Sequence, residues 1–150
     1  MPENARGSDS GIDAVRALTE ALMTVPGRLN IDSVADICRV TLRPSSSANP
    51  YVQIAEGVFA AGPVESVECR WSETGPGLVV FAVRPGLVLD DDNRERWPGR
   101  PVESFTEPDI PPEGTECFRY VRGRRALVIE VAARSRTLLH VAIREEPSLP

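Results

Sequence analysis

The stretch ECFRYVRGRRALVIEVAARSRTLLHVAIR, residues 116–144, decides the fold of this 150-residue chain. Within it, Leu127, Ile129 and Val131 alternate with Val128 and Glu130. This two-residue period is typical of a strand with one apolar face. The runs ECFRYVR, ALVIEVA and TLLHVAIR are separated by GRR and ARSR, which are short enough for hairpins. The stretch therefore predicts three consecutive antiparallel strands.

The same pattern recurs upstream. The runs YVQIAEGVF, VESVECRWS and GLVVFAVRP are joined by AAGP and ETGPG, whose glycine and proline favour tight turns. Cys38, Val40 and Leu42 also alternate with polar residues and predict a further strand, although a short helix opening at Asn30 or Asp32 competes for this segment. We expect six to seven strands in all.

An amphipathic helix is predicted near the N-terminus. Ile12, Val15 and Leu22 recur at helical spacing, Ser10 can cap the start, and Pro26-Gly27 closes the segment. We expect residues 1–9 and 145–150 to be flexible tails that flank a single domain, residues 10–144.

The run LDDDNRERWPGRP, residues 89–101, has two interpretations. In the first, Asp90 caps a short helix near 90–97, and Trp97 anchors it on the sheet or contacts a partner. In the second, the aspartates Asp90 to Asp92 bind Mg²⁺. A calcium loop of the EF-hand type is disfavoured because Arg94 occupies the fifth position, which needs an oxygen ligand. The helix explains more of the residues, so we expect no metal.

These elements together predict an α+β fold. A single, mainly antiparallel sheet of about six to seven strands would carry the N-terminal helix and the short helix near 90–97 on one face. Residues 83–144, with VRPGLVLDDD, WPGRP, a proline-rich loop and closely spaced strands, resemble in layout the domains of beta-lactamase inhibitor protein and of small bacterial immunity-type proteins. That resemblance implies a sheet surface that binds another protein.

Charge is unevenly distributed along the chain. The net charge of −5 disfavours nucleic acid as a partner. Residues 90–116 carry nine acids against three arginines, a local charge of −6, and residues 117–150 carry seven arginines against three glutamates, a local charge of +4. This asymmetry suits a protein partner or self-association. The predicted partner-binding residues are Asp91, Asp92, Trp97, Glu107, Asp109, Arg122, Arg124 and Arg125.

Other features bear on the cellular setting. All 17 basic residues are arginine, which suggests the GC-rich coding of some bacteria. The N-terminus lacks the basic start and apolar core of a signal peptide, and no apolar stretch is long enough to span a membrane. The cysteines Cys38, Cys69 and Cys117 form no CxxC pair and are expected to be buried, reduced thiols. We therefore expect a cytoplasmic protein.

Catalytic motifs are missing from the sequence. His140 is the single histidine and lies in a strand on the face shared with Ala142 and Arg144, without a GxSxG nucleophile context. Neither GxGxxG nor GxxxxGK occurs, so we expect no nucleotide cofactor. The run YVRGRRAL mixes arginines with aromatic residues as nucleic-acid binders do, but a solvated hairpin tip at Gly123 explains it more simply.

The sequence thus predicts a small protein-binding module, of inhibitor or immunity type, that acts through a sheet face and the acidic 90–116 segment. One alternative is a small-molecule-binding protein or enzyme with a pocket between the first helix and the sheet, using His140 or an aspartate metal site. Another is a structural homo-oligomer, since exposed edge strands can pair with their own copy.

Overall fold

The computed structural model describes residues 3–45, 51–71, 77–90, 96–107 and 114–145. Within these ranges the chain forms two helices followed by eight strands. The elements are α1 (Glu3–Met23), α2 (Ile31–Cys38), β1 (Arg43–Ser45), β2 (Gln53–Val58), β3 (Val64–Trp71), β4 (Leu78–Val83), β5 (Arg100–Glu107), β6 (Thr115–Arg122), β7 (Arg125–Ala132) and β8 (Leu138–Glu145).

All eight strands belong to one antiparallel sheet, in the order β1-β2-β3-β4-β8-β7-β6-β5. The chain forms two meanders of four strands, and β4 pairs with β8 where the meanders meet. The predicted α+β class with a single antiparallel sheet is confirmed. The sheet has one strand more than the upper end of the predicted range.

The additional strand is β5, which occupies part of the predicted proline-rich loop. It pairs antiparallel with β6 and has a register shift between Pro101 and Glu103. Proline removes a ladder hydrogen bond, which an edge strand or a bulge tolerates. Because β5 lies at the edge of the sheet, Pro101 is compatible with strand structure there.

The segment around Cys38 is helical, and the strand predicted over residues 38–42 is wrong. α2 runs to Cys38, and β1 begins at Arg43. A capping box starts the helix: the Asn30 side chain accepts a hydrogen bond from the Ser33 N–H at 2.9 Å, and the Ser33 hydroxyl accepts from the Asn30 N–H at 3.1 Å. This local stabilisation of the helix overrides the weak alternation that follows it.

Two other helix boundaries differ from the sequence prediction. α1 begins at Glu3, so Ser10 is inside the helix rather than its cap, and residues 3–9 are helical. The short helix predicted near 90–97 falls mostly on residues 91–95, outside the described part of the chain. The residues after this gap, 96–99, form a turn and bends.

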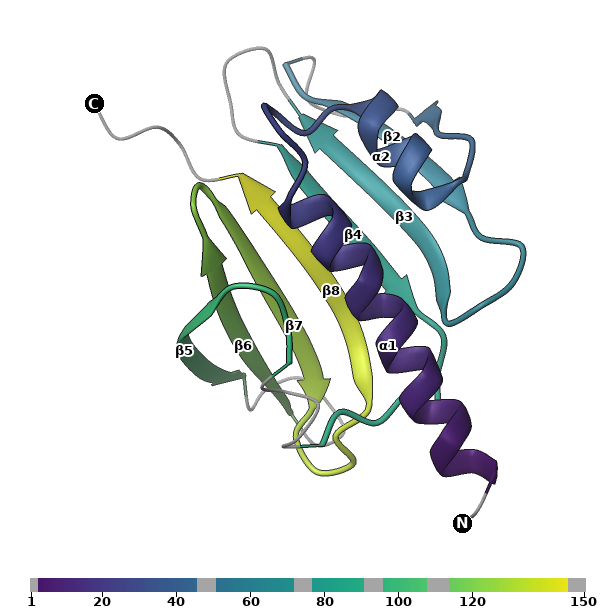
Figure 1. The fold of residues 1–150 in the computed structure, drawn as a ribbon, viewed down its shortest axis with the longest axis vertical. Helices are drawn as coiled ribbons and strands as arrows, with labels where there is room; N and C mark the ends of the chain where they lie inside the picture. The colour runs from purple at the N-terminus through teal and green to yellow at the C-terminus, as the bar shows by residue number, and fades with distance from the viewer. Residues whose placement is uncertain (1–2, 46–50, 72–76, 91–95, 108–113, 146–150) are drawn as a thin grey trace.

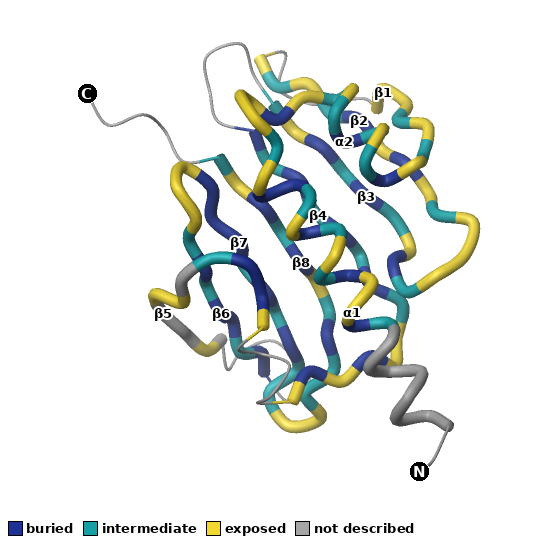
Figure 2. Tube along the Cα trace, in the orientation of Figure 1, coloured by how far each residue is buried: buried dark blue, intermediate teal, exposed yellow. Residues whose placement is uncertain are grey.

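One face of the sheet is covered by α1, by α2 and by residues 84–90 and 96–99, of which 96–99 pass in front of β6 and β7 (Figure 1). Buried residues recur along the central strands, beneath this covering layer (Figure 2). The largest buried side chains of the core include Phe81, Tyr120, Leu89, Leu127 and Ile143. The covered face therefore contains the hydrophobic core of the domain.

Trp97 belongs to this core. Its side chain is 3% exposed and lies in the same hydrophobic cluster as Phe118 and Tyr120. Gly99 follows with φ +100°, and a Cβ there would lie 3.0 Å from the carbonyl oxygen of Val121, so glycine lets the segment approach β6. The core interpretation of Trp97 is confirmed.

A buried arginine joins the end of α1 to the sheet. Arg125 donates hydrogen bonds to the carbonyl oxygens of Leu22, at 3.0 Å, and of Val25 and Gly27. The same guanidinium lies 3.8 Å from the carboxylate of Glu145. The last carbonyls of a helix lack internal partners, and a cation also complements the helix dipole there. Arg125 is 7% exposed, so it is not part of the solvated hairpin tip that the sequence suggested.

Candidate functional site

The second face of the sheet lies opposite the helices, and none of the described helices or loops is packed on it (Figure 1). Residues that alternate with the core positions of β4, β8, β7 and β3 form this surface, because side chains alternate across a strand. We name it the open face and define it by Glu68, Arg70, Leu78, Val80, Ala82, Val128, Glu130, His140, Ala142 and Arg144.

The centre of the open face is apolar. Val128 on β7 is opposite Ala142 on β8, which is opposite Val80 on β4. Leu78 and Ala82 extend this row along β4. All five side chains are partly exposed, whereas their neighbours on the covered side are buried. Cross-strand neighbours lie about 4.5–5.5 Å apart at Cβ, so these side chains form one continuous apolar patch.

Charged side chains surround the patch. Arg70 forms an ion pair of 2.6 Å with Glu68 on the same strand. Nδ1 of His140 lies 3.6 Å from Glu130, its partner in the β7–β8 register. Arg144 is exposed, and its guanidinium forms no hydrogen bond or ion pair with the described residues. The open face thus has an apolar centre with a polar rim, as protein interfaces commonly do.

The arrangement around His140 is not that of a nucleophile and its base. The Sγ atom of Cys117 lies 3.9 Å from a Glu130 oxygen, and Glu130 lies between Cys117 and His140 in the strand register. A catalytic dyad needs the imidazole within hydrogen-bond reach of the thiol. Cys117 is also 3% exposed, which keeps it from a substrate on this face.

The predicted partner-binding residues do not converge in the described structure. Asp91, Asp92 and Asp109 lie outside the described residues. Glu107 ends β5, where its backbone pairs with Thr115 on β6. The structure therefore describes no continuous acidic surface for the 90–116 segment.

The hairpin arginines point to different parts of the molecule. Arg122 is exposed and forms a 2.8 Å ion pair with Glu20 of α1. Arg124 is exposed in the β6–β7 turn. Arg125 is buried under the end of α1. Arg122 and Arg125 face the helices and Trp97 is buried in the core, so these three residues are not on the open face.

The thiols of Cys38 and Cys69 are buried on the covered side between α2 and the sheet. Burial raises the pKa of Cys38 to about 12, with a further contribution from Cys69. Burial likewise raises the pKa of Cys69 to about 11, with a smaller contribution from Glu68. Both are therefore neutral packing groups near neutral pH, as the sequence predicted.

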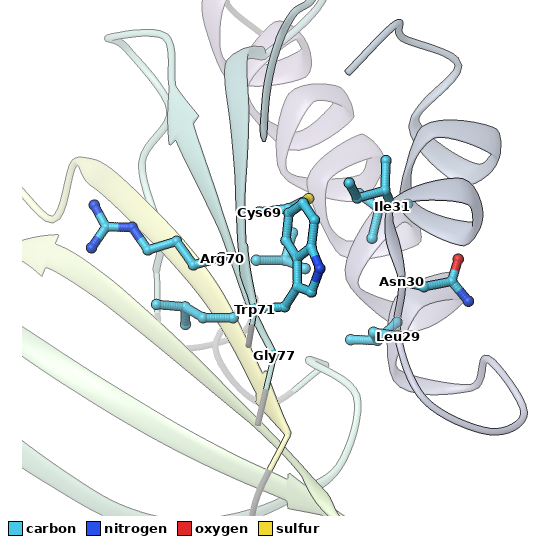
Figure 3. A pocket seen from close by; sticks show the side chains of 10 residues that line it. Leu29, Asn30, Ile31, Cys69, Arg70, Trp71 and Gly77 are labelled. Carbon is cyan, nitrogen blue, oxygen red and sulfur yellow. The ribbon is translucent and has the colours of Figure 1, made fainter. Parts of the chain in front are cut away.

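A small cavity beside these thiols is too small for a metabolite. It lies between α2 and β3, with Leu29, Ile31, Trp71 and Gly77 around it (Figure 3). Its volume is about 20 Å³, which is room for one water molecule. This cavity therefore does not provide the predicted ligand pocket between helix and sheet.

Metal-ligand residue types are not grouped in the part of the chain that the structure describes. No cluster of three His, Cys, Asp or Glu residues suited to a metal occurs among the described residues. The aspartate site Asp90 to Asp92 remains a prediction, because Asp91 and Asp92 lie beyond the described segments. None of the helices in the described ranges is long and apolar enough to cross a membrane.

Sequence reasoning missed the apolar patch, although β4 carries its signal. The run LVVFAV, residues 78–83, is apolar at every position, whereas β3 alternates with charges. A strand buried on one face needs apolar residues only at every second position. The extra apolar residues Leu78, Val80 and Ala82 therefore mark a second surface suited to contact.

Comparison of the chain with models of known families, with curated proteins and with solved structures finds no match.

Proposed function

We propose that this protein is a protein-binding module whose contact surface is the open face. The observation that carries the proposal is the apolar patch of Leu78, Val80, Ala82, Val128 and Ala142 on the sheet side without a described covering layer. An exposed, contiguous apolar patch with a polar rim is typical of a protein interaction site.

The dimensions of the sheet support this proposal. Eight strands of three to eight residues, at about 3.3 Å per residue and about 4.8 Å between strands, give a face on the order of 900 Å². One side of a standard protein interface buries about the same area. The central patch would supply the desolvated core of the contact, and Arg70, Glu68, Arg144, Glu130 and His140 would supply its rim.

An inhibitor or immunity role is the form of this function that the sequence resemblance implies. Such a protein needs a rigid, preformed surface, since preorganisation lowers the entropic cost of binding. Strands β4 and β8 at the centre of the open face each pair on both sides. That central placement supports a rigid contact surface.

The experiment is affinity capture from a lysate of the source organism, comparing the wild-type chain with a Val80→Glu/Val128→Glu variant. Both positions are partly exposed, so the folded state should tolerate the change better than it would tolerate buried charges. A Val102→Glu variant is the control, because Val102 is 43% exposed on the edge strand β5. We expect a stoichiometric partner with the wild type and the control, and at least a tenfold loss of affinity with the double variant.

Equal capture by all three proteins would contradict the proposal. Circular dichroism and thermal melting of each variant verify that a loss of binding does not come from unfolding. Analytical ultracentrifugation distinguishes the homo-oligomer alternative: a wild-type dimer that the double variant converts to a monomer would mean that the partner is a second copy of this chain.

A further inference from the structure

We infer that a groove that runs along α1 to the β1 edge of the sheet binds an anionic amphiphile, with its alkyl chain on α1 and its acidic head group at Arg39 and Arg43. The groove has two parts, an apolar one and a basic one. They adjoin each other, because both are lined by Phe59 and Ala61.

The apolar part has a volume of about 420 Å³. This is within the range of sites for small ligands. Small side chains of α1 leave the space open, because Ala14, Ala17 and Ala21 recur at helical spacing on one side of the helix. Ile37 of α2 and Pro63 after β2 complete the walls. The lining contains no charged side chain, which suits an alkyl chain.

The floor of this part is held in place by the sheet. Phe59 makes an edge contact with Phe81 of the core, with ring centroids 6.5 Å apart. Arg84 donates hydrogen bonds to the carbonyl oxygens of Phe59, at 3.0 Å, and of Gly62, at 2.9 Å. A groove whose floor is fixed in this way does not have to be ordered when a ligand binds.

The basic part has a volume of about 820 Å³ and includes Arg39, after α2, and Arg43, on β1. Within the described ranges, neither guanidinium has a hydrogen bond or an ion pair. Glu56 is opposite Arg43 in the β1–β2 register, so the three side chains leave a net charge of +1. Arginine is well suited to bind a carboxylate or a phosphate.

The backbone of Arg39 gives a second reason to look for a ligand. Arg39 and Arg136 are the non-glycine residues with positive φ in the described chain, at 56° and 62°. Arg136 has an intramolecular explanation, since it pairs with Glu116 at 2.5 Å and lies over the Phe118 ring at 5.5 Å. The Arg39 side chain has no such contacts, although glycine would occupy this C-cap conformation with less strain. A ligand for its guanidinium would explain why arginine stands there.

Calorimetric titration with monomeric dodecanoate, below its critical micelle concentration, tests the inference. Butanoate, which lacks the tail, and dodecyltrimethylammonium, which reverses the charge, are the comparison ligands. We expect dodecanoate to bind at least tenfold more tightly than either. Equal binding of the cation, no heat of binding at millimolar dodecanoate, or binding to anionic vesicles alone would overturn the inference.

Three variants locate the site. Ala17→Trp should fill the apolar part and abolish binding, and Arg39→Gln should weaken dodecanoate about tenfold without affecting the cation. Glu56→Gln should strengthen dodecanoate binding by removing a like charge. Arg134→Gln is the control, because Arg134 is exposed in the β7–β8 turn outside the groove. If Ala17→Trp binds like the wild type, or if the control loses as much affinity as Arg39→Gln, the ligand is elsewhere.

This ligand site is independent of the proposed protein partner. The groove and the open-face patch share no residues, so Val80→Glu/Val128→Glu should bind dodecanoate as the wild type does.

Discussion

The two faces of the sheet differ at neighbouring positions of the same strand. Phe81 and Val80 are adjacent on β4, yet Phe81 is 0% exposed under the helices and Val80 is partly exposed on the open face. Both side chains are apolar. The comparison teaches that an apolar side chain in a strand stabilises the fold only where another layer of the protein covers it, and elsewhere is available to a partner.

Truncating these neighbours should have the largest difference in effect. Phe81→Ala should lower the free energy of unfolding by about 3–5 kcal/mol, because it removes buried area and leaves a cavity. Val80→Ala should lower it by less than about 1 kcal/mol, since the side chain keeps contact with water. Urea denaturation followed by circular dichroism measures both. A similar loss for the two variants would mean that the open face is covered, and the proposed contact surface would be wrong.

The two faces also differ in their arginines, since Arg125 is buried on the covered face and Arg144 is exposed on the open face. Arg125→Ala should lower the free energy of unfolding by about 3 kcal/mol, because Glu145 and the last carbonyls of α1 lose a buried cation. Arg144→Ala should change it by no more than about 0.5 kcal/mol, since its exposed side chain has no partner in the described structure. Thermal and urea denaturation of the two variants at neutral pH give the values. Equal effects would contradict the interpretation of Arg125 as the residue that joins α1 to the sheet.

Alkaline pH should weaken the covered face through its thiols. Burial raises the pKa of Cys38 from 9.0 to about 12 and that of Cys69 from 9.0 to about 11. Above pH 9 the unfolded chain releases these protons while the folded chain retains them, so the free energy of unfolding falls as pH rises toward the folded values. Each thiol should lower the free energy of unfolding by roughly 1 kcal/mol per pH unit in that interval.

The measurement is urea denaturation between pH 8 and pH 10.5, in the wild type and in a Cys38→Ala/Cys69→Ala variant. The variant should be less stable at pH 8 because its core has cavities, but its stability should fall less steeply above pH 9. Parallel pH dependences would show that the thiols are not buried in the folded protein.

Local patterns predicted much of this architecture. Alternation in β3, β7 and β8 and helical spacing in α1 depend on neighbouring residues, so the single antiparallel sheet could be predicted. The helical state of Cys38 depended on the Asn30–Ser33 capping box, which competed with a short alternation. β5 was missed because edge strands tolerate proline that would disrupt a central strand.

The candidate site was harder to predict, because its residues come from four strands. Leu78 and Val128 are 50 positions apart in the sequence and meet on one surface through the β4–β8–β7 pairing. The buried state of Arg125 could not be read locally either, since a hairpin with Arg122, Gly123 and Arg124 is typical of a solvated turn. Its hydrogen-bond acceptors lie about 100 residues earlier, in the last turn of α1 and just after it.

The sequence by itself determined the fold class, the segments of six of the eight strands, the acidic net charge and the burial of the cysteines, because each follows from residue type and short-range periodicity. The tertiary structure decided which apolar face of β4 is buried in the core and which is at the surface. It also decided which arginines form hydrogen bonds or ion pairs within the chain. A periodic pattern predicts that a strand has two faces. Only the placement of α1, α2 and residues 84–90 and 96–99 determines which face loses its contact with water.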